Sequence, residues 1–186
     1  MTAVAQEHPV LRAIYERRAV RSFSPEIVSE SAIQALLDAA VHAPTAMHRE
    51  PWGFVVIQDP AQLKRYSDRG KAMVPREHLE AHFADPTFNI FYNAGTLIVI
   101  CGPSEGAFVE ADCWLAAENL MLAATALGLG TCCIGLALPI LNTPEVKRDL
   151  EIPDQFSAIA AIIVGVPSGH TPPVPRKAPV VLHWAR

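Results

Sequence analysis

The stretch that spans residues 106–127 reads GAFVEADCWLAAENLMLAATAL and predicts one long helix. Alanine and leucine favour a helix, and Gly128 follows directly, at a position where a helix commonly ends. Apolar residues cover nearly the whole circumference of this helix instead of one stripe, which is typical of a helix buried in a core or against a partner chain. We therefore expect this helix to be buried on most of its sides.

Apolar runs on both sides of this stretch predict three strands, at residues 53–58, 96–101 and 156–166. Periodic segments predict four shorter helices, at residues 8–16, 29–43, 60–70 and 145–150. Residues 71–93 read as irregular or helical, and residues 179–184 as a short extra strand. The strands are few and unevenly spaced, and no dinucleotide-binding fingerprint follows the first one. We therefore expect an α+β fold with helices on both faces of a sheet.

The length and composition indicate a single globular domain over residues 1–186. Hydrophobic residues make up 51% and charged residues 18% of the chain, which excludes an intrinsically disordered protein. A net charge of −4 argues against a nucleic-acid binder. The high apolar content fits either an ordinary enzyme core or a large subunit interface, and composition alone does not choose between them.

Cysteine usage and the distribution of charge bear on the cellular compartment. Four cysteines stand at positions 101, 113, 132 and 133 without a C-x-x-C pair, which is typical of a reduced, cytoplasmic protein, and residues 1–10 contain no apolar leader segment. Residues 120–141 carry no charge, but glycines and Pro139 interrupt them. We expect a helix end, a turn and an apolar strand or loop there, and no membrane span. His78 and His82 lie four residues apart without a third ligand, so we expect no metal.

A cluster of arginines near the N-terminus is the first candidate binding site. Arg17, Arg18 and Arg21 lie within five residues of one another, and arginine forks match the oxygens of a phosphate. If the preceding helix continues, Arg17 and Arg21 share one of its faces. A solvated basic helix end would explain the same residues, and both interpretations stay open.

Residues 43–52, which read APTAMHREPW, form the second candidate site. Two prolines hold a loop that carries a hydroxyl, a histidine, an arginine and a glutamate, and such a rigid polar loop suits a binding surface. The alternative is a rigid connection in which Trp52 fills the core and Arg49 pairs with Glu50 in solvent.

Glycines and a basic tail give two weaker signals. Residues 128–135 read GLGTCCIG, which matches neither the dinucleotide-binding pattern nor the Walker pattern. We expect these glycines to end the helix and to let backbone N–H groups approach a flat or anionic group. Arg176 and Lys177 stand in a proline-rich tail, where they are either solvated or a further cationic contact to a phosphate.

Taken together and in this order, these segments resemble the nitroreductase family of FMN-dependent oxidoreductases over nearly the whole chain. ERRAVRSF at residues 16–23 is similar to the family's RRSxRxF opening, and residues 43–52 are similar to its APSxxNxQPW loop. ALGLGTCCIG at residues 126–135 resembles its GLGSxxxG stretch, and VGVP at 164–167 with PRKAP at 175–179 completes the pattern. Each motif alone is weak, and their order and spacing make the match specific.

The resemblance implies a fold, an assembly and a cofactor. We expect a central, mostly antiparallel sheet flanked by helices, and an intertwined homodimer with the long helix at its interface and two FMN sites between the subunits. The cofactor-binding residues that the resemblance implies are Arg17, Arg18, Ala19, Arg21, Pro44, Thr45, Ala46, His48, Cys133, Ile134, Gly135 and Arg176.

The resemblance also implies what these residues do. Arg17 and Arg176 would hold the FMN phosphate, and Arg18 and Ala19 would line the ribityl chain. Arg21 would lie at the N1–C2=O edge, where a cation stabilises the reduced flavin. Four loop residues would reach the isoalloxazine from the partner subunit: Pro44, Thr45, Ala46 and His48. The backbone N–H groups of Ile134 and Gly135 would point to N5 and O4.

Three positions depart from the family pattern: Ala19 replaces a serine, His48 an asparagine and Glu50 a glutamine. Ala19 lacks a hydroxyl contact. His48 would donate a hydrogen bond to the flavin, protonate a substrate or only pack at the interface, and it is the one candidate catalytic side chain. Glu50 would pair with Arg49 or with Arg21.

The expected function is an oxidoreductase with a ping-pong mechanism, in which NADH or NADPH reduces FMN and an electron-poor small molecule, such as a nitroaromatic or a quinone, then takes the electrons. Four aromatic residues are expected to line the substrate pocket: Phe83, Phe88, Phe91 and Tyr92. The alternatives are an enzyme of the same superfamily that fragments flavin or dehalogenates its substrate, an FMN-binding module without turnover, and a structural dimer without cofactor.

Overall fold

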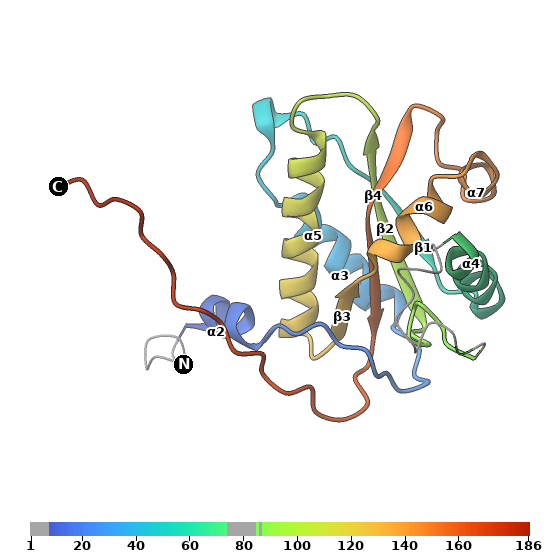
Figure 1. Cartoon of the computed structure of the whole chain (residues 1–186), viewed down its shortest axis with the longest axis horizontal. Coiled ribbons are helices and arrows are strands. Elements are labelled where there is room, and N and C mark those ends of the chain that lie inside the picture. Colours follow the sequence, from blue (N-terminus) through green and yellow to red (C-terminus); the bar gives the residue numbers. More distant parts are fainter. Residues whose placement is uncertain (1–7, 74–84, 86) are drawn as a thin grey trace.

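Within residues 8–73, 85 and 87–186, which the computed structural model of the chain describes, four strands form one central antiparallel sheet (Figure 1). The strands lie in the order β1-β2-β4-β3. Their bounds are Gly53–Ile57 for β1, Thr96–Pro103 for β2, Gly130–Cys133 for β3 and Phe156–Gly165 for β4. The expected α+β fold with a mostly antiparallel sheet is therefore confirmed.

Both faces of the sheet are covered by helices, because alternate residues of a strand point to opposite sides. On β2, Leu97 and Val99 pack into a first apolar cluster, whereas Ile98 and Ile100 pack into a second. The first cluster includes residues of α4 (Pro60–Met73), α6 (Leu138–Leu141) and α7 (Pro144–Asp149). The second includes residues of α3 (Glu30–Val41) and α5 (Val109–Ala126). The sheet thus lies between two helical layers (Figure 1).

Local signals set the helix boundaries within a few residues of the predicted ones. The hydroxyl of Ser29 accepts a hydrogen bond from Ala32 N at the start of α3, and Thr143 accepts one from Val146 N at the start of α7. Such side-chain caps satisfy backbone N–H groups that a helix start leaves unpaired. The other helical elements of the described residues are α2 (Pro9–Glu16) and the 3₁₀ turns η1 (Ala46–His48) and η4 (Gly135–Ala137).

The long helix α5 is buried on one side, and its other side is largely apolar around the exposed Glu118. Cys113, Ala116 and Leu120 are fully buried against the sheet and α3. On the outer side, Trp114 and Leu115 are 38% and 45% exposed. Within one chain, the expectation of a helix buried on most sides therefore holds for the inner face, and the outer face is left as an apolar surface.

After α5 the chain turns and enters β3. Gly128 makes this turn with a φ of 74°, a left-handed conformation that favours glycine. The helix end, turn and apolar strand that we expected within residues 120–141 are thus observed. No helix in the described residues is long and apolar enough to cross a membrane.

The C-terminal tail, residues 169–186, runs past α2 and away from the sheet (Figure 1). The strand predicted at residues 179–184 is wrong, because this segment has no neighbouring strand among the described residues. Val180 and Leu182 are 84% and 95% exposed. The apolar residues that suggested a strand therefore have no surface to pack against within the described chain.

Candidate functional site

The segment that follows α2 lies beside β3. The helix stops before Arg17, whose ψ of 132° is extended. Ala19 forms a parallel bridge with Thr131, and Val20 N donates a hydrogen bond to Thr131 O at 2.9 Å. The chain thus continues along the sheet instead of the helix, and the alternative in which Arg17 and Arg21 share a helix face is wrong.

The three arginines of this segment have different surroundings. Arg18 donates to two backbone carbonyls at the end of α2, at 2.6 and 2.9 Å, as the helix-end interpretation requires. Arg17 Nε lies 3.6 Å from the Oε1 atom of Glu118 on α5. Arg21 is exposed, and its guanidinium carbon lies 5.8 Å from the centre of the Tyr92 ring. Arg18 therefore caps a helix, whereas Arg17 has a long contact with Glu118 and Arg21 forms no hydrogen bond or ion pair with the described residues.

The end of β3 lies close to these two charges. Burial raises the pKa of the Cys132 thiol, and the positive charges of Arg21 and Arg17 oppose this rise. A thiol with a raised pKa stays protonated at neutral pH and is a poor nucleophile. The next residue, Cys133, has its Sγ atom 3.6 Å from the Sδ atom of Met121 on α5. The end of β3 thus carries two positive charges beside a thiol whose pKa is raised.

One of the two backbone amides expected to face a cofactor is open. Ile134 N donates to Ala161 O of β4 at 2.8 Å, so the expectation that this N–H points to a cofactor is wrong. Gly135 N makes no hydrogen bond in the described part of the chain. A Cβ atom on Gly135 would meet no described atom within 4 Å. Gly135 is exposed, and its N–H has no hydrogen-bond acceptor among the described residues.

Residues 44–52 form a loop near the N-terminal end of α5 (Figure 1). Met47, His48 and Glu50 have left-handed backbones, with φ of 58°, 51° and 45°. This conformation costs roughly 1–2 kcal/mol for a residue other than glycine, so surrounding contacts must hold it. The side chain of His48 is exposed and makes no hydrogen bond with the described residues.

The rigid-connection interpretation of this loop is half correct. Trp52 packs against the second apolar cluster, as that interpretation required. Arg49 and Glu50 form no ion pair with each other or with another described residue. Their charges therefore stay exposed on the loop.

Asp112 of α5 holds the loop, and the sequence did not indicate this. Both carboxylate oxygens lie near Ala46 N, at 3.2 and 3.3 Å, and the residue is only 5% exposed. In the sequence, Asp112 lies inside the helix predicted over residues 106–127, and nothing around it distinguishes it. Its tertiary contact leaves no local signal.

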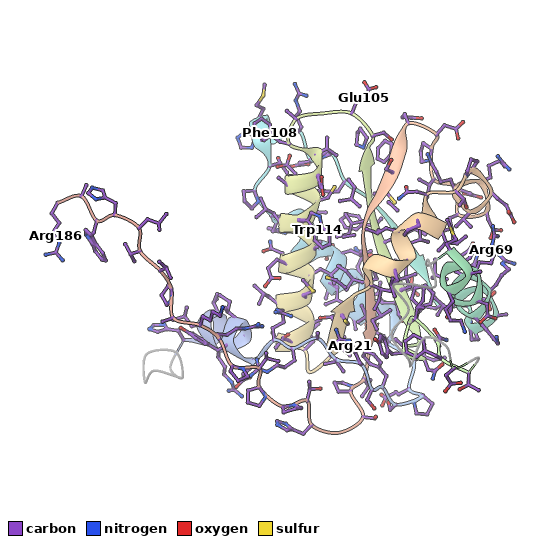
Figure 2. The ribbon with its side chains drawn as sticks, in the orientation of Figure 1. Arg21, Arg69, Glu105, Phe108, Trp114 and Arg186 are labelled. Atoms are coloured by element: carbon purple, nitrogen blue, oxygen red, sulfur yellow. The ribbon has the colours of Figure 1, made fainter. Side chains whose placement is uncertain are left out.

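The residues expected to contact one cofactor fall into two groups. We call Arg17, Arg21, Cys133 and Gly135 the β3 group, and residues 44–48 the loop group. Within the β3 group, Cys133 contacts Met121 and Arg17 contacts Glu118, whereas the loop group contacts Asp112. The two groups thus meet α5 at points about 9–14 Å apart along the helix, at 1.5 Å per residue. Figure 2 shows Phe108, beside the loop, at the opposite end of α5 from Arg21. Arg176 in the tail makes no hydrogen bond or ion pair with the described residues, so one chain does not assemble the expected site.

The aromatic residues expected in a substrate pocket are dispersed. Phe83 lies outside the described part of the chain, as do His78 and His82, the two histidines considered for a metal site. Phe91 is 1% exposed and packs in the first apolar cluster, so it does not line a surface. Phe88 borders a cavity of about 690 Å³ and meets the Tyr92 ring edge-on, with ring centres 5.5 Å apart. Tyr92 links this pair to Arg21. Among the described residues, no cluster of His, Cys, Asp and Glu could hold a metal ion.

Comparisons with known proteins agree with one another. The model of the nitroreductase family matches residues 14–166. A protein of Methanothermobacter thermautotrophicus with the provisional name NADH dehydrogenase/NAD(P)H nitroreductase is 30% identical over 165 residues, which are 86% of this chain and 78% of that protein. The structure is similar to an FMN-dependent nitroreductase of Clostridium difficile R20291, with a TM-score of 0.84, 25% identity and coverage of 96% of this chain and 100% of that one. A nitroreductase of Bacteroides fragilis with bound FMN gives a TM-score of 0.80, 26% identity and coverage of 94% and 96%. The chain therefore belongs to the nitroreductase family.

Proposed function

We propose that the chain is a cytoplasmic, FMN-dependent NAD(P)H oxidoreductase, with one domain over residues 1–186, that reduces small electron-poor acceptors such as nitroaromatics or quinones. The observation that carries the proposal is the β3 group, in which the charges of Arg17 and Arg21 lie near Cys132 at the end of β3 and Gly135 N, just beyond it, makes no hydrogen bond with the described residues. Bound FMN would supply the redox chemistry, taking a hydride from NADH or NADPH and passing electrons to the acceptor in a second, ping-pong half-reaction. The FMN bound by the Bacteroides relative and the NAD(P)H in the Methanothermobacter relative's name support the choice of cofactor and donor.

The β3 group fits the phosphate and the ring of FMN. Arg17 and Glu118 lie 3.6 Å apart, longer than a normal hydrogen bond, so a phosphate dianion would be the stronger partner for Arg17. Arg21 would lie at the pyrimidine edge of the ring, where its charge favours the reduced form. The N–H of Gly135 would donate to the ring from the end of β3. These groups bind and orient, and none of them acts as a nucleophile.

The loop group requires a second copy of the chain. It meets α5 about 9–14 Å away from the points where the β3 group does, and the outer face of α5 is largely apolar. In a two-fold dimer with antiparallel α5 helices, the first half of one helix lies opposite the second half of the other. The loop group of one subunit would then meet the β3 group of its partner. We propose a homodimer with two FMN sites between the subunits, in which Arg176 adds a second cation to each phosphate.

The remaining side chains would serve the ring and the acceptor. Arg18 and Ala19 would lie along the ribityl chain. The exposed imidazole of His48 would donate a hydrogen bond or a proton at neutral pH. Phe88 and Tyr92 would form one wall of the acceptor pocket, next to Arg21.

The visible absorption spectrum of the purified protein tests this proposal. We expect a flavin spectrum that bleaches on anaerobic addition of NADH or NADPH and recovers with a nitroaromatic or a quinone. A flavin spectrum that neither donor bleaches would favour a binding module without turnover. A colourless protein that takes up no added FMN would overturn the proposal. Light scattering after size exclusion should give twice the mass of one chain.

A further inference from the structure

We infer that Asp112 is a positioning residue that sets the place of the loop group and, through it, the surroundings of the flavin ring in the partner subunit. This inference rests on the proposed function. The observation behind it is the pair of contacts from the Asp112 carboxylate to Ala46 N, at 3.2 and 3.3 Å.

The burial of Asp112 shows that this contact matters. A carboxylate that is 5% exposed needs a hydrogen-bond donor or a positive charge to offset its lost hydration. Among the described residues, Ala46 N is the only hydrogen-bond donor to its side chain. Asp112 also lies in the first turn of α5, where the helix dipole favours a negative charge. The helix therefore stabilises the carboxylate, and the carboxylate fixes the loop.

Apart from the packing of Trp52 at its end, the loop has only weak hydrogen bonds to fix its position. Among the described residues, its other hydrogen bonds are local and long, from His48 N and Glu50 N to Thr45 at 3.4 Å and from Arg49 N to Ala46 O at 3.3 Å. A cavity of about 130 Å³ lies between the loop and residues 106–109. The loop is thus linked to α5 across a gap by one buried side chain, while three of its residues keep strained backbones.

Loss of this link should change the ring environment more than the phosphate contact. Ala46 lies between Thr45 and His48, which we place on the flavin of the partner subunit. The β3 group does not depend on Asp112, because its segment is bonded to β3. A shift of the loop would therefore expose the ring and leave the phosphate site intact.

Four variants test this inference. Asp112→Ala removes both acceptor oxygens, and Asp112→Asn keeps one of them without the charge. Ala46→Pro removes the donor N–H from the other side, and the extended backbone of Thr45 (φ −130°, ψ 148°) tolerates a following proline. Glu110→Gln is the matched control, because Glu110 is exposed in the same turn of α5.

The measurements are the FMN dissociation constant, the visible circular dichroism of bound FMN, and the thermal stability of the FMN-free protein. Asp112→Ala and Ala46→Pro should each weaken FMN binding about tenfold or more and alter the flavin dichroism. Asp112→Asn should stay within about threefold of the wild type, because it keeps an acceptor for the loop. Glu110→Gln should match the wild type in both flavin measurements.

Two results would overturn the inference. One is wild-type FMN affinity and dichroism in Asp112→Ala and Ala46→Pro with only thermal stability reduced, which would make Asp112 a structural residue. The other is an Asp112→Asn variant as impaired as Asp112→Ala. Should Asp112→Ala fail to fold, Ala46→Pro and Asp112→Asn still decide. A wild-type protein that takes up no FMN would refute the proposed function itself, before any variant is compared.

Discussion

The β3 group and the loop group are the two halves of one proposed site, and they are built in opposite ways. The β3 group lies on a segment that is bonded to the sheet, through the Ala19–Thr131 bridge and the bond from Ile134 N to Ala161 O. The loop group lies on a left-handed loop that the Asp112 carboxylate holds at Ala46 and that Trp52 anchors only at its end. The half that would hold the phosphate therefore belongs to the rigid core, and the half that would cover the ring does not.

This difference separates cofactor retention from ring environment. Groups held by a sheet keep their geometry within narrow limits, whereas loops change position and sequence at a lower cost. We expect changes in the β3 group to affect FMN binding first. Changes in the loop group should affect the ring and the acceptor without loss of the fold. The following variants test this contrast.

Arg17→Ala should have the largest effect on the rigid half. Removal of a charge-assisted contact to the phosphate should raise the FMN dissociation constant roughly 100-fold. The free energy of unfolding of the FMN-free protein should change by less than about 0.5 kcal/mol, because the Arg17–Glu118 pair is long and partly exposed. Fluorescence titration and urea unfolding measure the two quantities. Arg12→Ala, which breaks an exposed pair on α2, is the control. Comparable losses of binding and stability in Arg17→Ala would show a structural role instead.

Gly130→Ala and Gly135→Ala should differ in stability. A Cβ atom on Gly130 would lie 2.8 Å from the Cβ of Val20, so the segment after α2 would have to move off β3. We expect a loss of about 1–3 kcal/mol in the free energy of unfolding. A Cβ atom on Gly135 meets no described atom within 4 Å, so this variant should lose less than about 1 kcal/mol. Equal losses in urea unfolding would mean that the segment is not packed tightly on β3.

Met47→Gly should stabilise the protein. Met47 is 75% exposed and has a φ of 58°, so glycine would relieve backbone strain while little packing is lost. The free energy of unfolding should rise by about 0.5–1 kcal/mol. Ala35→Gly, at an exposed position of α3, should lower it by about 1 kcal/mol. A decrease in both variants would show that the left-handed loop is not under strain.

Tyr92→Leu should have the smallest effect. It removes the ring that lies 5.8 Å from the Arg21 guanidinium, a contact worth about 0.5–1 kcal/mol at an exposed site. Without this ring the Arg21 guanidinium would be held less firmly and would stabilise reduced FMN less. The midpoint potential of bound FMN should therefore fall by roughly 10–20 mV for two electrons. Tyr92→Phe keeps the ring and should leave the potential unchanged in a dye-coupled titration. Equal shifts of the midpoint potential in the two variants would show that the Tyr92 ring does not hold the Arg21 guanidinium.

The central elements could be predicted from the sequence because their signals are local. A short window of residues is enough to predict the apolar strand β2, the alanine-rich helix α5 and the start of α3 at Ser29. The arginine motif was also readable, but its three members have three different environments. Only the end of α2, where the chain turns to pair with Thr131, decides which of them stays available.

The contacts that complete the site could not be predicted, because they join distant parts of the chain. Asp112 and Ala46 are 66 residues apart, and no local pattern relates them. The N–H of Ile134 is taken by β4, which depends on the pairing of strands from separate segments. The strand predicted in the tail was wrong for the same reason, because alternating apolar residues form a strand only where a neighbouring strand can pair with them.

The apolar outer face of α5 has a consequence for how the protein's stability must be measured. If a second copy covers Trp114 and Leu115, folding and association are coupled, and mass action makes the melting temperature rise with protein concentration. Dilution would then weaken the fold and the flavin site together, because each subunit supplies a part of its partner's site. A stability value for such a dimer would be meaningful only with the concentration at which it was measured.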